Sequence, residues 1–416
     1  MRIFKFGGAS VKSAEGIINV AKIIDQHGAM PLLIVVSALG KTTNLIENII
    51  KQKWEHGEAS HFEQLTTFHD EIITKLFAEE EDIRLSIQSI YHQLYRNLTE
   101  ITTDDFDFFY DQTVSYGEIL SSTILYHYLK KVGHNCYWID SRNIISTDET
   151  FRQANVDFVK TARNVNKEVL PKITPDRMVI TQGFIGGKHN NVTTLGREGS
   201  DYSAAIYASL LNAKSMTVWK DVPGVLNADP RFFENPVKIE VMNYQEAAEL
   251  TYYGASVLHP KTIRPLAESG IPLEVRSFEN PELKGTIIDS NGDMHHLESK
   301  ILLQNQCLMT FRMKNFSFIQ EEALSKLFLV LHELNIKLNL MQNSALSFSI
   351  CFDYSEQNVE EIMVNLQSDF NILFNNELQL LTIKNFKEQS VETAILEKEI
   401  YLEQRSRSTF QIVYKW

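Results

Sequence analysis

Cysteine is scarce in this sequence of 416 residues, which contains only Cys136, Cys307 and Cys351. The three are scattered and lack the spacing of metal ligands, so neither a disulfide framework nor a zinc site is indicated. Buried apolar thiols in a reducing compartment are the simplest interpretation. Long apolar runs and signal-peptide patterns are missing as well. We therefore expect a cytoplasmic protein without a membrane segment.

Positive charge is also in deficit, because 53 acidic residues outnumber 40 Lys and Arg residues and leave a net charge of −13. Such a chain is repelled by nucleic acids and anionic membranes, so neither is an expected partner. A local basic pocket for a phosphate remains compatible with this balance. The length exceeds one ordinary core and predicts two or three folded units.

The chain opens on an apolar strand that contains Lys5 and is followed by Gly7 and Gly8. Adjacent glycines let backbone N–H groups approach a ligand, and the helical pattern that follows would favour an anion at its start. A lysine inside an apolar strand is costly unless its ammonium has a partner. A phosphate suits this place, and an edge-strand lysine that reaches solvent is the alternative. The stretch matches neither a Walker A loop nor the dinucleotide fingerprint.

Small polar residues follow other predicted strands. The apolar run 31–36 leads into residues 37–43, and the strand at 177–181 leads into the glycine-rich stretch 182–187. Open α/β sheets bind ligands at such strand ends, although a helix-capping turn is the alternative at 37–43. Alternating strands and helices predict an open, mostly parallel sheet between helices. Residues 44–103 are interpreted as a helical insertion or lid without chemistry.

Charged residues lie near these segments. Glu118 is in an apolar helical pattern and is a candidate for a substrate ammonium, with a solvated helix charge as the alternative. Arg197, Ser200 and Asp201 precede another helix, which Ser200 or Asp201 is expected to cap. Arginine grips a carboxylate in a bidentate fork, and an aspartate accepts from an ammonium or orients Mg²⁺. These residues therefore also suit a site for an anionic amino acid.

A long loop rich in Pro, Gly, Asn and Asp follows the predicted strand 215–219. It contains Lys220, Asp221, Asp229 and Arg231, which suit nucleotide phosphates and a metal ion. Turn residues then dominate 280–298, where we place the boundary between units 1–290 and 299–416. Beyond it the elements follow the order βαββαβ, a ferredoxin-like arrangement. Two further strands, at 399–403 and 409–414, predict a second unit that is truncated.

The motifs, taken together, resemble those of aspartate kinases, within the amino-acid kinase family. The resemblance is strong over about residues 1–290 and weaker beyond, where the chain resembles ACT-type regulatory units. The matching blocks are Lys5-Phe6-Gly7-Gly8-Ala9-Ser10-Val11, Ser37-Ala38-Leu39-Gly40, Ser115-Tyr116-Gly117-Glu118, Thr194-Leu195-Gly196-Arg197, Gly199-Ser200-Asp201-Tyr202-Ser203-Ala204, Asp221-Val222-Pro223-Gly224-Val225, Asp229-Pro230-Arg231 and Leu258-His259-Pro260.

The resemblance implies an amino-acid kinase fold followed by α+β ACT-type domains. It also implies transfer of the γ-phosphoryl group of ATP, with Mg²⁺, to the side-chain carboxylate of L-aspartate. The product, 4-phospho-L-aspartate, would lead to lysine, threonine, methionine and diaminopimelate. Phosphoryl transfer needs positioning and charge neutralisation more than covalent chemistry, which fits the charged residues above.

The resemblance further implies individual roles. Lys5 would stabilise the transferring phosphoryl group and Asp201 would organise Lys5 and the substrate. Glu118 would hold the substrate ammonium and Arg197 its α-carboxylate. No side chain is singled out as a metal ligand. The remaining expected substrate-binding residues are Ser37, Thr43 and Ser200, and the expected ATP-binding residues are Lys5, Gly7, Gly8, Lys220, Asp221, Leu226, Asp229 and Arg231.

Several positions depart from the family pattern. Glu198 replaces a small residue, often Gly, and puts a negative charge beside the phosphate site. Its expected partner is Lys220, which itself replaces the common Thr. Leu226 replaces an aromatic residue that often packs on adenine. Ser256 replaces a lysine, for which Lys261 is the expected substitute. These departures concern nucleotide affinity rather than the reaction class.

The regulatory part departs as well. Residues 342–345 replace the usual Thr-Ser-Glu, and residues 316–322 offer bulk and negative charge where effector-binding units begin a helix with glycines. Weak or absent feedback by lysine is therefore expected. Unpaired sheet edges in the truncated unit are expected to be covered by a second copy. This predicts a homodimer through the ACT region that buries Phe348 and Ile350.

Two alternatives remain open. A kinase of the same fold acting on glutamate or N-acetylglutamate is disfavoured by the ACT-like region and by the block at 258–260. A degenerate kinase kept as an amino-acid sensor or scaffold is favoured only by Glu198, Ser256 and the short tail, against the retained charged residues of the site. The effector, the oligomeric state and the downstream branch are left open by the sequence.

Overall fold

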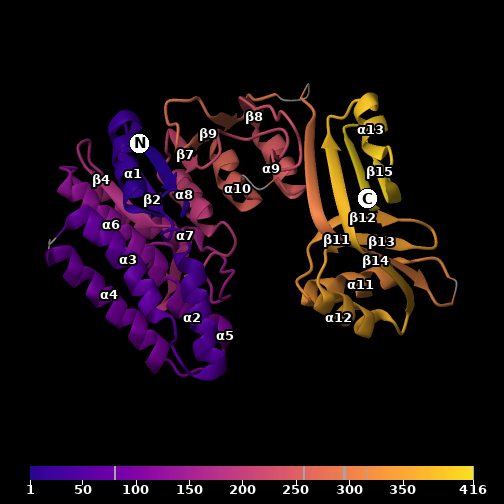
Figure 1. The fold of residues 1–416 in the computed structure, drawn as a ribbon, viewed down its shortest axis with the longest axis horizontal. Coiled ribbons are helices and arrows are strands. Elements are labelled where there is room, and N and C mark those ends of the chain that lie inside the picture. The colour runs from indigo at the N-terminus through magenta and orange to yellow at the C-terminus, as the bar shows by residue number, and fades with distance from the viewer. Residues whose placement is uncertain (79–80, 256–257, 294–296, 316, 416) are drawn as a thin grey trace. The chain divides into compact units, whose positions relative to one another are not determined.

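The computed structural model describes residues 1–416 except 79–80, 256–257, 294–296, 316 and 416 (Figure 1). The chain forms two units. Unit 1 comprises residues 1–225, 238–248 and 257–292, and unit 2 comprises residues 226–237, 249–256 and 293–416. Unit 2 therefore includes two segments that precede the turn-rich stretch at 280–298. Within the described part of the chain, no helix combines the length and apolarity needed to cross a membrane.

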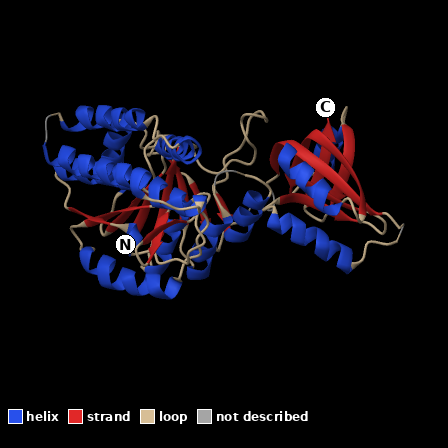
Figure 2. Ribbon diagram, turned by 90° about the horizontal axis from the view of Figure 1, so that it is seen from below, coloured by secondary structure: helices blue, strands red, loops and turns tan. Residues whose placement is uncertain are grey.

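Unit 1 is built on an eight-stranded sheet in the order β3-β4-β2-β1-β7-β9-β10-β8. Neighbouring strands run parallel except β9 and β10, which are antiparallel. Helices lie on both sides of the strands (Figure 2), so the predicted open, mostly parallel sheet is confirmed. The strands are β1 (Arg2–Phe6), β2 (Leu32–Val36), β3 (Cys136–Ile139), β4 (Met178–Gln182), β7 (Ser215–Lys220), β8 (Val241–Asn243), β9 (Leu273–Ser277) and β10 (Thr286–Asp289).

The central strands are apolar because both faces of the sheet are covered. Every residue of β2 and β4 is buried. Lys5, in β1, pairs with Val35 of β2 on one side and Val218 of β7 on the other. It therefore belongs to a central strand, which excludes the alternative of an edge-strand lysine that reaches solvent.

The helices of unit 1 include the predicted insertion, where α2, α3 and α4 bury apolar faces in the main core. The apolar helical pattern around Glu118 belongs to α6, which follows α5 after Ser115. The helices are α1 (Ala14–His27), α2 (Thr42–His56), α3 (Phe62–Phe77), α4 (Glu81–Glu100), α5 (Phe106–Val114), α6 (Tyr116–Lys131), α7 (Phe158–Asn164), α8 (Gly199–Leu210) and α10 (Pro260–Ser269), with a hairpin of β5 (Ile185–Lys188) and β6 (Asn191–Thr194) and a helix α9 (Tyr244–Tyr252) that contributes to both units.

The start of α8 differs from the expectation. Glu198 is its N-cap residue, in a left-handed conformation with φ 53°, and no side chain caps the helix. Ser200 and Asp201 lie inside the first turn, so the prediction that one of them is the cap is wrong. A capping side chain belongs to the residue before the first turn, from which its oxygen accepts a hydrogen bond from a free N–H group of that turn. Both side chains are thereby left for other contacts.

Unit 2 contains a six-stranded antiparallel sheet in the order β12-β13-β11-β14-β16-β15. The first six elements follow the predicted βαββαβ order. The long strands β11 and β14, 15 residues each, extend through both halves of the sheet. The elements are β11 (Ser299–Met313), α11 (Glu321–Glu333), β12 (Leu338–Asn343), β13 (Phe348–Asp353), α12 (Glu356–Leu366), β14 (Phe370–Lys384), α13 (Glu388–Ile395), β15 (Glu399–Arg405) and β16 (Thr409–Lys415).

The expected interface residues of unit 2 are interior residues. Phe348 is 4% exposed and Ile350 is 0% exposed, and both pack in the core beneath α11 and α12. The prediction that a second copy buries them is therefore wrong. The edge strands β12 and β15 also approach each other, since Gln342 Nε2 donates to the carbonyl oxygen of Glu403 at 3.4 Å.

Candidate active site

Asp201 lies between two lysines at the C-terminal ends of adjacent strands. Its Oδ1 is 2.6 Å from Lys5 Nζ, at β1, and its Oδ2 is 3.1 Å from Lys220 Nζ, at β7. Burial by itself raises the pKa of Asp201, but the two ammonium groups lower it by a larger amount. The pKa of Asp201 is therefore below its usual value. A buried ionised carboxylate thus fixes two cations at one end of the sheet.

The glycine turn after β1 packs against the end of β2. A Cβ on Gly8 would lie 2.7 Å from the carbonyl oxygen of Ala38, and Gly40 N donates to Gly8 O at 3.0 Å. A Cβ on Gly7 would lie 3.5 Å from Lys5 Nζ, so the ammonium is beside this turn. The helix α1 begins later, at Ala14, with Ser13 as its cap. The predicted order of strand, glycine turn and helix is therefore confirmed, and an anion at the helix start stays a prediction.

Glu118 is buried in the first turn of α6 and is only 3% exposed. Its Oε1 accepts from Ala38 N at 3.4 Å, whereas its Oε2 is buried without a hydrogen-bond partner among the described residues. Burial raises its pKa to about 8, although Lys5 opposes the shift. The alternative of a solvated helix charge is therefore excluded. A buried oxygen of this kind is costly unless a donor meets it, which suits an ammonium ligand.

The turn before α8 presents the other charged residues. Arg197 is exposed. Ser200 packs closely on Gly183, because a Cβ added to Gly183 would lie 2.5 Å from the Cβ of Ser200. Burial raises the pKa of Glu198, while Lys220 lowers it. Asp201 and Glu198 both raise the pKa of Lys220 against the opposing effect of its burial. The two departures from the family pattern therefore interact electrostatically.

The exit of β2 carries the next expected residues. Ser37 N donates to Phe6 O at 3.1 Å, and Thr43 is half-buried in the first turn of α2. The neighbouring Thr42 is fully buried, with its Oγ1 3.2 Å from His69 Nε2. Burial lowers the pKa of His69 to about 4, so the ring is neutral. His69 was missed in the sequence because α3 was assigned no chemistry; its only signal is a polar ring on an apolar helix face.

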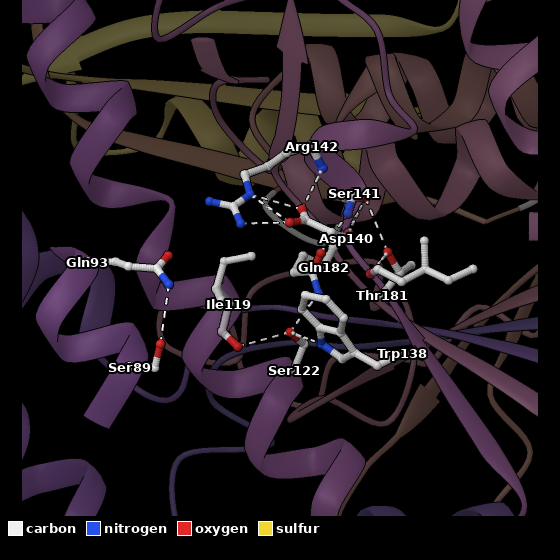
Figure 3. Close-up of polar contacts among 11 residues, drawn as sticks. Ser89, Gln93, Ile119, Ser122, Trp138, Asp140, Ser141, Arg142, Thr181 and Gln182 are labelled. Atoms are coloured by element: carbon white, nitrogen blue, oxygen red, sulfur yellow. Dashed lines mark hydrogen bonds and ion pairs between the residues drawn. The ribbon is translucent and has the colours of Figure 1, made fainter. Parts of the chain in front are cut away.

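A buried polar network joins α6 to the neighbouring strands (Figure 3). Gln182, at the end of β4, accepts from Ser141 N at 2.7 Å and donates to Ser122 Oγ on α6 at 2.7 Å. Trp138 Nε1 donates to the same Ser122 oxygen at 3.0 Å. The hydroxyl of Tyr207, on α8, lies 2.7 Å from Ser141 Oγ. The helices that carry Glu118 and Asp201 are thereby tied to one set of strand ends, a connection that local sequence patterns do not reveal.

The expected nucleotide loop is divided between the units. Asp221 is an exposed residue of unit 1, whereas Leu226, Asp229 and Arg231 belong to unit 2. Arg231 NH2 lies 2.6 Å from Asp229 Oδ2, so these two charges pair with each other. The nucleotide role of Leu226, Asp229 and Arg231 stays a prediction.

Ser256 is expected to replace a lysine of the family pattern, with Lys261 as the substitute. Ser256 lies outside the described residues. Lys261 is exposed in the first turn of α10, where its N–H donates to His259 Nδ1 at 3.2 Å. Its role as a substitute stays a prediction.

Comparison with known proteins places this geometry in context. The model of the amino acid kinase family matches residues 1–277. The chain is 32% identical to lysine-sensitive aspartokinase 3 of Escherichia coli, over 84% of this chain and 78% of that protein. It is 29% identical to bifunctional aspartokinase/homoserine dehydrogenase 2 of Arabidopsis thaliana, over 89% of this chain and 42% of that protein. The chain thus spans less than half the length of such bifunctional relatives.

Solved structures are similar over the whole chain. Aspartokinase III of E. coli in complex with aspartate and ADP, in the R-state, has a TM-score of 0.84 and 26% identity, and the match covers 100% of this chain and 96% of that one. The same enzyme with lysine and aspartate, in the T-state, has a TM-score of 0.82 and 26% identity, with 99% and 95% covered.

Proposed function

Because the chain belongs to the amino acid kinase family and, within it, to the aspartokinases, we propose that it transfers the γ-phosphoryl group of ATP to the side-chain carboxylate of L-aspartate. The product is 4-phospho-L-aspartate, which begins the biosynthesis of lysine, threonine, methionine and diaminopimelate. The similarity to an aspartokinase crystallised with aspartate and ADP supports both substrates.

The observation that carries the proposal is the pair of lysines held on one buried carboxylate. Lys5 and Lys220 approach opposite oxygens of Asp201, at 2.6 and 3.1 Å. Two fixed ammonium groups beside a glycine turn offer the charge neutralisation that phosphoryl transfer needs, without reorganisation during the reaction. In this proposal Lys5 contacts the transferring group and Gly7 and Gly8 donate backbone N–H groups to it.

The substrate is held from the other side of the site. Glu118 takes the ammonium of aspartate with its unpartnered Oε2, and Arg197 takes the α-carboxylate in a bidentate fork. Ser37, Thr43 and Ser200 complete this pocket. The side-chain carboxylate is then left free to face the γ-phosphoryl group, so one end of the amino acid is recognised and the other reacts.

The reaction requires no proton transfer. An oxygen of the substrate carboxylate, which is ionised near neutral pH, attacks the γ-phosphorus. The bond from that phosphorus to the β–γ bridging oxygen breaks, and ADP leaves with the electron pair. The developing charge on the phosphoryl oxygens is met by the two lysines.

Mg²⁺ is the proposed companion of ATP. Among the residues that the structure describes, no group of three or more His, Cys, Asp and Glu side chains forms a metal site. Mg²⁺ usually keeps waters and binds substrate phosphates with one or two carboxylates, so this donor set fits it. Each oxygen of Asp201 already faces a lysine. Glu198, whose Oε2 is buried without a hydrogen-bond partner among the described residues, is the carboxylate of the cluster that would hold the ion. The ion would supply further neutralisation of phosphate charge.

We propose residues 1–290 as the catalytic domain and residues 299–416 as an ACT-type regulatory region, in a cytoplasmic enzyme that binds neither nucleic acid nor membranes. A homodimer through the regulatory region is part of this proposal. It is supported by large apolar side chains that are exposed there, namely Phe318, Leu329, Val364 and Leu373. Weak or absent inhibition by lysine is also proposed, because the segment before α11 lacks glycine.

The test is a steady-state assay of ADP release by the purified chain with Mg-ATP and aspartate. Glutamate and N-acetylglutamate are assayed at the same concentrations, and Lys5→Met serves as the inactive control. Turnover with aspartate that exceeds the other acids and is lost in the control is the expected result. Preference for another acid, or no nucleotide turnover with any of them, would refute the proposal.

A further inference from the structure

Asp111, in α5, is a buried carboxylate that acts as an acceptor for a loop at Arg152 and for the end of β6 at Thr194. It is 0% exposed. Its Oδ2 accepts from the backbone N–H of Arg152 at 2.9 Å and from that of Thr194 at 2.8 Å. Its Oδ1 accepts from Thr194 Oγ1 at 2.8 Å. Each oxygen is therefore engaged, and two backbone donors converge on one of them.

The two segments that Asp111 joins run beside each other. Ala154 N donates to Thr194 O at 2.9 Å. A Cβ on Gly196 would lie 3.2 Å from the carbonyl oxygen of Arg152, and Gly196 has a φ of +76° that other residues rarely adopt. The segment 152–154 therefore forms a wall against which the turn after Thr194 folds.

Arg152 is held in an unfavourable backbone conformation, with φ 65°. A non-glycine residue adopts this region only where its surroundings compensate. Here the N–H of Arg152 donates to Asp111, and its guanidinium carbon lies 4.6 Å from the centre of the Tyr110 ring. Both contacts come from α5, so this helix fixes the conformation of the wall.

Gln112, the next residue of α5, binds the backbone of β6 through its side-chain amide, as a neighbouring strand would do with its backbone. Gln112 Nε2 donates to Val192 O at 2.8 Å, and its Oε1 accepts from Val192 N at 3.0 Å. Together, Asp111 and Gln112 satisfy successive backbone groups along the free edge of β6. The turn that begins at Thr194 therefore starts from a fixed point.

We propose that Asp111 is a positioning residue, which holds Thr194 and the adjoining wall so that the turn 195–197 presents Arg197 to the α-carboxylate of the substrate. The inference rests on the proposed function, because it gives Arg197 its ligand. Asp111 itself touches neither substrate nor nucleotide. Only two residues separate Thr194 from Arg197, so displacement of the first moves the second.

The electrostatics agree with an acceptor role. Burial raises the pKa of Asp111 to about 6, and the N–H groups of Arg152 and Thr194 oppose that rise. What matters for positioning is the acceptor geometry, which an amide can reproduce in part. The oxygen of an asparagine can accept from both backbone donors, while the Thr194 hydroxyl can rotate to accept from its amide.

The experiment compares Asp111→Leu, which removes all acceptors, with the isosteric Asp111→Asn. Asp111→Leu is expected to raise the aspartate KM about tenfold or more, with the ATP KM changed less than about threefold, because misplacement affects only the group that is moved. Asp111→Asn is expected to stay within roughly threefold of the wild type for both substrates. An unchanged aspartate KM in Asp111→Leu, or an equal rise for both substrates, would overturn the proposal.

Thr113→Val is the matched control on the same helix. Thr113 is 0% exposed and its Oγ1 donates to Phe109 O within α5, at 2.8 Å. This variant also loses a buried hydrogen bond but touches neither segment, so both KM values should stay unchanged. A rise in the aspartate KM equal to that of Asp111→Leu would show a general effect of destabilising α5 and would overturn the positioning role.

Two further measurements keep the inference testable. If Asp111→Leu does not fold, Thr194→Val removes only the hydroxyl contact and is expected to raise the aspartate KM roughly threefold; an unchanged value overturns the inference. If the wild type shows no turnover with aspartate, the proposed function fails independently. The positioning is then tested by hydrogen exchange, in which the amides of Arg152 and Thr194 should exchange faster in Asp111→Leu than in Asp111→Asn. Equal rates would refute it.

Discussion

Replacing Glu118 by glutamine is the sharpest test of the proposed substrate pocket, because it changes charge but not shape. Glutamine keeps an oxygen that can accept from Ala38 N, the contact of 3.4 Å that the carboxylate makes. It loses the capacity to pair with an ammonium. The substitution therefore separates the electrostatic role of this side chain from its packing in the first turn of α6.

The pH dependence of stability follows from burial. Burial raises the folded-state pKa of Glu118 to about 8, from 4.5 in the unfolded chain. Its contribution to stability is therefore fully present below pH 4.5 and is lost as the pH rises toward 8, since the unfolded chain ionises first. Between pH 5.5 and pH 8 the loss is on the order of 3 kcal/mol. Glu118→Gln removes this pH-dependent contribution. The free energy of unfolding of the variant should therefore increase relative to that of the wild type as the pH rises.

The activity should respond in the opposite direction. An ammonium ligand needs the ionised carboxylate, so the aspartate KM of the wild type should fall about tenfold for each pH unit up to about 8. Glu118→Gln should have an aspartate KM roughly 10 to 100 times higher at pH 8, because a charge-assisted hydrogen bond is lost. Its KM should show little dependence on pH in this range.

The assays are denaturant unfolding at pH 5.5 and 8 without ligands, and initial rates at the same pH values. Glu58→Gln is the control, since Glu58 is exposed in the turn after α2. A wild type and a Glu118→Gln variant with the same pH dependence of unfolding would refute the burial argument. An unchanged aspartate KM in the variant would refute the ammonium role, whatever its stability.

The same site and unit 2 give four further predictions. Lys5→Met should lower kcat by about a hundredfold or more, and near-normal kcat would contradict the role of Lys5 in phosphoryl transfer. The variant should also be less stable, because Asp201 stays buried with only one lysine. Arg197→Lys should raise the aspartate KM several-fold, roughly tenfold, and a change confined to the ATP KM would place Arg197 on the nucleotide side. Light scattering should give a dimer, and calorimetry should detect little lysine binding; a monomer, or tight lysine binding with loss of activity, would contradict the two proposals in turn.

The overall fold could be predicted because its signals are local. Apolar runs that end in glycine or hydroxyl residues mark parallel strands, and their alternation with helices indicates an open sheet. The reciprocal capping of Asn243 and Glu246 is of the same kind: each side chain accepts from the other residue's backbone N–H, at 3.1 and 2.8 Å. Such features involve residues within a few positions of each other.

The contacts that support the site could not be predicted in this way. Asp111 and Thr194 are 83 positions apart, and Thr42 and His69 are 27 apart. No periodicity reports such a pair, because each partner alone is typical of an ordinary helix or strand. The wrong assignment of Phe348 has a related cause: an alternating pattern indicates one buried face, but not whether the same chain or a second copy covers it.

The charges around Asp201 explain why the two departures from the family pattern belong together. Glu198 occupies a left-handed N-cap position with φ 53°, where glycine is unstrained, and it adds a carboxylate beside the proposed phosphate site. With Lys5 and Asp201 alone, that addition would leave the cluster negative and would oppose phosphate binding. Lys220 restores the balance, since it lies 3.1 Å from Asp201 and also lowers the pKa of Glu198. The second lysine is therefore a physical requirement of the extra carboxylate, and loss of either residue alone should disturb the site more than loss of both.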